Sequence, residues 1–326
     1  MKALEPITNR YASQSPAGLR RFTKFVASST LFLIFAGAMV TSTGSGLAVP
    51  DWPTTYGENM FTFPLSKWVG GIFYEHGHRL IASTVGFLTI IQAIWLQRRE
   101  PKKFVRTLGW LSLAAVIVQG LLGGITVILL LPKAVSISHA ALAEIFFCIN
   151  VSIAFFTSRW YHELRTMEKG DAPVRMAWSL TALVYLQIVA GAVLRHLGAG
   201  LAIPDFPLSF GKLVPNFLSQ EIVAAYVHRA GGFVVAAAVI AVAIRLLRYH
   251  RDHPLRALAH LLVAVVAAQV LLGGYVIWSA KQPHITSLHV MLGASTLALS
   301  LVLTLSARTL SWRSTSRQHA LIEVTA

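Results

Sequence analysis

Two short polar stretches, each at the head of a long apolar run, carry the side chains best suited to chemistry. Residues 75–79 read Glu-His-Gly-His-Arg and precede an almost wholly apolar run. A second stretch, Tyr226-Val227-His228-Arg229, opens another apolar run in the same way. Carboxylate, imidazole and guanidinium groups placed this close together can move protons, bind a metal ion or hold an anion.

Four of the twelve histidines recur at a fixed interval. His78 and His228 are 150 residues apart, as are His139 and His289, and 61 residues separate the two histidines within each half. We expect all four at the outer ends of helices that enter from the same side, and so at similar depth. Paired imidazoles that face each other across a helix bundle are typical of bis-histidine heme sites. The alternative is that they are polar helix ends at the water interface.

The other residues that could bind a metal do not form a zinc site or an iron–sulfur cluster. Zinc needs three or four ligands in one tight site, often including cysteine or carboxylate. The chain has a single cysteine, Cys148, inside an apolar run, where we expect it to pack. One thiol excludes an intrachain disulfide and a cysteine-based iron–sulfur cluster. His196 is predicted to lie in an outer loop as a surface residue, with a contact to a heme propionate as the alternative.

Arg79 and Arg229 each follow a candidate ligand directly. A guanidinium group can bind both oxygens of a carboxylate, so both arginines are candidate contacts for heme propionates. The alternative is that they extend to the outer membrane interface. Asp51 and Asp205 each follow a proline in a repeated loop segment, where forming the turn is the default interpretation.

Glu75 distinguishes the two copies, because the matching residue in the second copy is Ala225. Three residues before His78, Glu75 would share a helical face with that imidazole. A carboxylate at the edge of a heme pocket can take a proton or stabilise a developing cation on the macrocycle. The alternative is a solvated loop carboxylate. The hypothesis is that the first half does chemistry with Glu75 and the second holds a fixed cofactor.

These residues must be positioned by membrane helices. The chain has 326 residues, of which 55% are hydrophobic and 13% charged, whereas about a quarter are charged in soluble domains. A membrane-spanning helix needs about 20 apolar residues. Eight runs qualify, at 25–43, 79–97, 107–131, 137–157, 176–194, 222–244, 257–279 and 285–307. The sequence therefore predicts an all-α polytopic membrane protein.

The net charge of +15 follows the predicted topology and does not indicate nucleic-acid binding. Of the 28 Lys and Arg residues, 21 fall in segments on one side of the eight-helix arrangement. The positive-inside rule makes that side cytoplasmic, so we expect both termini in the cytoplasm and the histidines towards the outer face. The N-terminal segment resembles neither a cleaved signal nor an organellar presequence, which favours a bacterial plasma membrane.

The chain repeats itself beyond the histidines. Residues 200–207 resemble 46–53, and Leu271-Leu272-Gly273-Gly274 matches Leu121-Leu122-Gly123-Gly124. Four helices per copy give both copies the same orientation, which predicts two tandem four-helix bundles related by a pseudo-two-fold axis along the membrane normal. The predicted division is an N-terminal arm (1–24), a catalytic half (25–158), a linker (159–175), a cofactor half (176–308) and a tail (309–326).

Together, Glu-x-x-His-Arg at 75–79 and the later histidines of two homologous halves closely resemble the heme A synthase family. That resemblance implies oxidation of the C8 methyl of heme O to the formyl group of heme A, for terminal oxidase assembly. It also implies that His78 and His139 hold the substrate heme, with Glu75 as the catalytic carboxylate. His228 and His289 would then ligate a permanent heme b that passes electrons.

The predicted outer loops contain no cysteine, so the chain resembles the cysteine-free bacterial subgroup of that family. The partners implied are heme O, an electron donor or acceptor and, as a candidate, heme O synthase; a homo-oligomer is left open. Two routes to the product stay open: release of one axial histidine with O2 binding, or electron withdrawal followed by attack of water.

Two other functions are weighed. A diheme membrane cytochrome b that only transfers electrons would explain the four histidines but not the single copy of Glu75. A transporter with parallel repeats would need several polar residues at mid-membrane, and few are present, Asn150 and Glu144 among them. Glu144 is interpreted either as part of a proton path or as a side chain satisfied by a neighbouring hydroxyl.

Overall fold

The computed structural model describes residues 14–167, 173–248 and 254–324, and the side chains up to residue 311. Within these ranges the chain is helical and has no strand; two isolated β-bridges lie in the outer loops. The helices are α2 (Ala17–Ser42), α3 (Gly71–Arg99), α4 (Lys103–Ile128), α5 (Lys133–Thr157), α6 (Arg159–Thr166), α7 (Val174–His196), α8 (Gln220–Leu247), α9 (Pro254–Trp278) and α10 (Pro283–Val324). Two short 3-10 helices, η1 (Leu65–Lys67) and η2 (Ala199–Leu201), belong to the outer loops.

Eight of these helices are long and apolar enough to cross a membrane, namely all except α6. The prediction of eight spans is therefore confirmed, and the chain is a multi-pass membrane protein. Several helix boundaries differ from the prediction, and three differences concern the arm, the linker and the tail. Helix α2 begins at Ala17, inside the predicted arm; the predicted linker contains α6; and α10 continues to Val324, past the predicted end at 307. In α6, Tyr161 and Leu164 are buried, which explains why part of the linker is helical.

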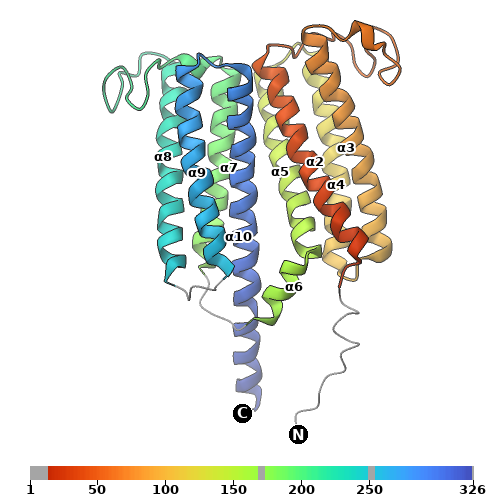
Figure 1. Cartoon of the computed structure of the whole chain (residues 1–326), viewed down its shortest axis with the longest axis vertical. Helices are drawn as coiled ribbons and strands as arrows, with labels where there is room; N and C mark the ends of the chain where they lie inside the picture. The colour runs from red at the N-terminus through yellow and green to blue at the C-terminus, as the bar shows by residue number, and fades with distance from the viewer. Residues whose placement is uncertain (1–13, 168–172, 249–253, 325–326) are drawn as a thin grey trace.

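The spans form two groups of four that stand side by side (Figure 1). In the first group α2 packs on α3 and α5, and α4 packs on the same two helices, which leaves α3 opposite α5. In the second group α7 and α9 both pack on α8 and α10, which leaves α8 opposite α10. Each of the four repeated histidines therefore lies on a helix that faces its partner helix across a bundle. The pseudo-two-fold relation and the predicted domain limits stay predictions.

The two groups meet along a seam where α10 packs on α2 and α5, and α5 packs on α7. Apolar side chains fill the seam, among them Phe147, Val184 and Leu297. Cys148 packs against this core as a free thiol, which confirms its predicted packing role. Burial on this scale holds the two bundles as one packed unit.

A buried polar cluster ties the four helices of the first bundle together. The Asn150 side chain on α5 accepts hydrogen bonds from Gln92 of α3, at 2.8 Å, and Ser112 of α4, at 3.0 Å. Its amide nitrogen donates to Thr30 of α2 at 3.5 Å. Unpartnered polar atoms are costly in hydrocarbon, so these contacts favour one arrangement of the four helices. Asn150, considered above as a transporter residue, thus has a packing role.

Replacing Asn150 with Leu should destabilise the protein by about 1–2 kcal/mol, because Gln92 and Ser112 would lose their partner inside the membrane. The measurement is the unfolding free energy in mixed detergent. Ser300→Ala is the matched control: Ser300 occupies the equivalent position in α10, and its hydroxyl donates only to Leu297 O of its own helix. Equal stability of Asn150→Leu and the control would contradict this role.

Candidate functional site

The structure brings each predicted histidine pair together. The ring centroids of His228 and His289 are 6.4 Å apart, and the ring planes are inclined at 83°. A metal bonded to two imidazole nitrogens at about 2 Å each separates the ring centroids by about 6 Å, so the spacing fits a bis-histidine heme. His78 and His139 lie on α3 and α5, which face each other across the first bundle. Their assignment as ligands stays a prediction.

Every one of these imidazoles rests against a glycine of a neighbouring helix. A Cβ atom at that glycine would lie between 2.8 and 3.3 Å from the Cε1 atom of the imidazole. The two contacts under 3.0 Å exclude a side chain and the other two would be crowded by one, so the glycines restrict where the rings can lie. The pairs are Gly37 with His78, Gly123 with His139, Gly191 with His228, and Gly273 with His289. In the repeated Gly-Gly motifs, the first glycine is thus the one that lies against a histidine ring.

Glutamines hold three of the four histidine turns. Gln119 and Gln269 donate to the backbone carbonyls of His139 and His289, at 2.9 and 3.0 Å. Gln187 donates to the His228 carbonyl at 2.6 Å, and its amide nitrogen lies 3.1 Å from Nδ1 of the same residue.

His78 is the exception among the four. Leu33 stands at the position that matches Gln187, so no glutamine holds the turn of His78; its Nδ1, like those of His139 and His289, is buried with no hydrogen-bond partner among the described residues. The ring of His78 is therefore held by packing alone, whereas that of His228 is also held by a polar contact.

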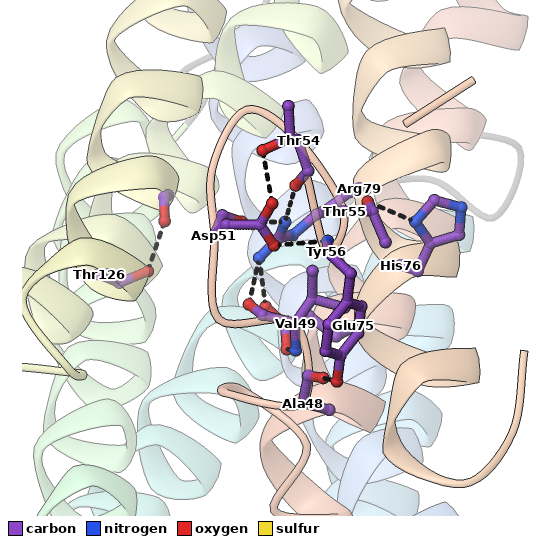
Figure 2. A network of polar contacts seen from close by, with 11 residues as sticks. Ala48, Val49, Asp51, Thr54, Thr55, Tyr56, Glu75, His76, Arg79 and Thr126 are labelled. Carbon is purple, nitrogen blue, oxygen red and sulfur yellow. Dashed lines mark hydrogen bonds and ion pairs between the residues drawn. The ribbon is translucent and has the colours of Figure 1, made fainter. Parts of the chain in front are cut away.

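Arg79 and Arg229 clamp the outer loops onto the helices, a role that the sequence analysis missed. Arg79 donates to the carbonyl oxygens of Asp51, Thr54 and Val49 at 2.7 to 3.1 Å (Figure 2). Arg229 does the same in the second copy, with Asp205, Leu208 and Ile203 as acceptors. The position of both arginines directly after repeated loops was the available signal. Their predicted contact with propionates stays a prediction.

Glu75 is buried, with 3% of its surface exposed, so the alternative of a solvated loop carboxylate is wrong. One carboxylate oxygen accepts from the backbone N–H of Val49 at 2.8 Å, and the other pairs with Arg79 at 2.6 Å (Figure 2). These two donors oppose the cost of burying the carboxylate. Because Ala225 replaces Glu75 in the second copy, only the first site has such an acid.

Asp51 and Asp205 form the loop turns, as the default interpretation predicted. The Asp205 carboxylate accepts from the backbone N–H groups of Gly211 and Phe210, and these bonds lower the pKa of Asp205. Asp51 makes the equivalent bonds to Gly57 and Tyr56. The two glycines have φ values of +71° and +75°, which favour glycine at these positions.

His76 pins the first outer loop to α3. The side chain is fully buried, its Nδ1 atom lies 3.0 Å from the Thr55 hydroxyl, and its ring packs 4.6 Å from Trp68 and 5.1 Å from Phe63. The repeat does not duplicate His76, so no role was predicted for it. The many aromatic residues of the loop could have indicated that the loop packs onto α3.

Aromatic side chains of both loops also seat on the helices. A Cβ atom at Gly124 or Gly274 would come within 2.6 Å of the ring of Trp52 or within 2.8 Å of that of Phe206, respectively. Each loop is therefore packed onto the outer end of its own bundle.

Glu144 and His196 differ from expectation. One carboxylate oxygen of Glu144 is buried with no hydrogen-bond partner among the described residues, so a neighbouring hydroxyl does not satisfy it. His196 is the last residue of α7, half-buried, and lies within electrostatic range of His139. It therefore belongs to a helix and does not lie in the outer loop, where it was predicted.

The family profile of the COX15-CtaA cytochrome oxidase assembly proteins matches residues 20–302, which include Glu75 and all four paired histidines. The chain belongs to this family. Its relatives include the heme A synthase of Shouchella clausii, 28% identical over 67% of this chain and 73% of the relative. The heme A synthase of Halalkalibacterium halodurans is 26% identical over 84% of this chain and 92% of the relative. That of Symbiobacterium thermophilum is 27% identical over 74% of this chain and 80% of the relative. The family expectation from the motif is therefore confirmed.

The contacts between glycine and imidazole allow heme binding to be tested in each bundle separately. Gly191→Val should push the His228 ring away and remove most of the heme of the second bundle, because the valine methyl groups cannot fit against the imidazole. Gly37→Val should act on the first site in the same way. The measurement is heme content per purified chain by pyridine hemochrome. Gly86→Val, where a Cβ atom meets open space, is the control. Wild-type heme content in Gly191→Val would refute the assignment.

Proposed function

We propose that this chain is a heme A synthase, a heme-binding membrane oxidoreductase that oxidises the C8 methyl of heme O to the formyl group of heme A. The observation that carries the proposal is the buried Glu75 carboxylate beside only one of two histidine pairs. A protein that only transfers electrons between two hemes has no use for an acid at one of them. Membership in the cytochrome oxidase assembly family, and relatives that are heme A synthases, support the same conclusion.

The second bundle is proposed to hold the resident heme b between His228 and His289. The 6.4 Å ring spacing supports this assignment, as do the glycine that contacts each imidazole and the glutamine that donates to each histidine carbonyl. When bound, this heme supplies one-electron transfer. The residues around it are suited to holding both rings still, which favours a fixed cofactor.

The first bundle is proposed to bind heme O through His78 and His139. Glu75, one helical turn from His78, would accept a proton from the attacking water or stabilise the cation that develops at the methyl carbon. The Val49 N–H and Arg79 keep the carboxylate in one position for that step. The weaker hold on His78 is compatible with the alternative route, in which one axial ligand is released before O2 binds.

The proposed setting is a bacterial plasma membrane with both termini in the cytoplasm and both heme sites towards the outer face. A heme O synthase would supply the substrate, and a separate redox partner would exchange electrons with the second bundle. The basic residues gathered on one side of the spans support this orientation.

The catalytic assignment is tested with Glu75→Gln, which keeps an oxygen to accept from Val49 but cannot act as a base. Product formation should fall about a hundredfold or more, with heme O or a hydroxylated intermediate accumulating. The readouts are extracted hemes by liquid chromatography and, as a control for the loop, hydrogen exchange at Val49. Normal heme A output with an intact loop would exclude catalysis by Glu75.

The division of labour is tested with His228→Ala and His78→Ala. The first variant should lose the resident heme signal in the reduced absorption spectrum, because one axial ligand is gone. The second should keep that signal and lose product, because only the substrate site is damaged. A purified wild-type protein without heme, or loss of the same signal in both variants, would refute the two-site assignment.

A further inference from the structure

Arg195 joins the two bundles at their outer end. It lies in the last turn of α7, in the second bundle, yet its guanidinium donates to the Ala38 carbonyl of α2 at 2.6 Å and to the Ser42 hydroxyl at 2.7 Å. Ser42 in turn lies 3.0 Å from the hydroxyl of Ser287 on α10. These contacts hold the half-buried guanidinium in one place at the seam.

The position of Arg195 is next to the first histidine site. Ala38 directly follows Gly37, the glycine that contacts the His78 ring. The Arg195 guanidinium is therefore bonded to the residue next to the glycine that the His78 ring touches. The end of α7 therefore borders the substrate site of the other bundle.

Arg195 has no acidic partner among the described residues. The ion pairs there join Lys67 to Glu58, Arg79 to Glu75, and Lys102 to Glu100. A cation removed from water without a counter-charge is costly, and the partial negative charge at a helix C-terminus compensates only part of that cost. An arginine retained there therefore favours an anionic ligand. The matching position in the first half is Thr41, so this cation exists in one copy only.

Arg79, the arginine next to His78, is already occupied. Arg79, the nearest candidate by sequence, donates to three loop carbonyls and is neutralised by Glu75. We propose that Arg195 binds a propionate carboxylate of the porphyrin in the first bundle, so that the second bundle supplies part of the substrate site. This inference rests on the proposed function, because it takes heme O as the ligand.

The experiment compares porphyrins with and without free carboxylates. Purified protein that carries its resident heme is titrated with iron protoporphyrin IX or with its dimethyl ester, and binding is followed by absorbance. Titration in a His78→Ala background identifies the signal from the first site. The wild type should bind the diacid about tenfold to a hundredfold more tightly than the diester, the range expected for a charged hydrogen bond. Arg195→Gln should bind both porphyrins equally, and Arg195→Lys should regain part of the preference.

Three outcomes would overturn the inference. In the first, the wild type binds the diacid and the diester equally well. In the second, the Arg195→Gln variant keeps the wild-type preference for the diacid. In the third, Arg195→Gln weakens the binding of both porphyrins equally, which indicates a purely structural role. The wild-type comparison stays decisive even where Arg195→Gln does not fold. Lys212→Gln, which removes an exposed cation of an outer loop, is the matched control and should keep the preference. Heme A formation by the wild type is measured separately, so failure of the proposed function is distinguished from failure of this inference.

Discussion

The contact between an imidazole and a glycine of the next helix is the constraint on which the rest of this structure depends. A methyl group would collide with the ring at Gly37 and Gly191 and would crowd it at Gly123 and Gly273. The contact therefore sets both the distance between neighbouring helices and the direction of the imidazole. The orientation of each imidazole and the spacing of the helices therefore depend on the same contact, and a substitution at one of these glycines changes both.

Hydrogen bonds between polar side chains inside the membrane also fix how the helices pack. The glutamines donate to the carbonyls of three histidine turns, and Asn150 joins all four helices of the first bundle. In hydrocarbon each such group needs a partner, so a small number of them is enough to favour one packing arrangement. The second bundle has apolar residues where the first has this cluster, with Val242, Leu262 and Val184 in place of Gln92, Ser112 and Thr30.

The proposed function depends on the residues in which the two four-helix copies differ. Glu75 on α3 is buried and Arg195 on α7 is half-buried, and the matching residues are Ala225 and Thr41. Glu75 lies three residues before His78 in the first bundle, whereas Arg195 is proposed to reach the same site from the other bundle. The seam between the bundles is therefore part of the proposed substrate site as well as the place where the two halves pack.

The sequence alone determined the class of the fold and the choice of candidate ligands. Eight apolar runs predicted eight spans, because crossing hydrocarbon requires length and hydrophobicity that composition reveals directly. The interval of 150 residues selected His78, His139, His228 and His289 from twelve histidines, because duplication preserves spacing. The helical ends were less predictable, since α6 and the extension of α10 lie outside the apolar runs.

Only the tertiary structure decided what each polar side chain touches. Arg79 follows a candidate ligand in sequence, yet its donors bind loop carbonyls and Glu75. Arg195 has no partner nearby in sequence, yet it joins α7 to α2. Spacing along a helix determines the face on which a residue lies, but which loop or helix covers that face depends on long-range packing. That is why periodicity and repeats could identify the histidines, while the clamp, the glycine contacts and the arginine at the seam became visible only in the folded chain.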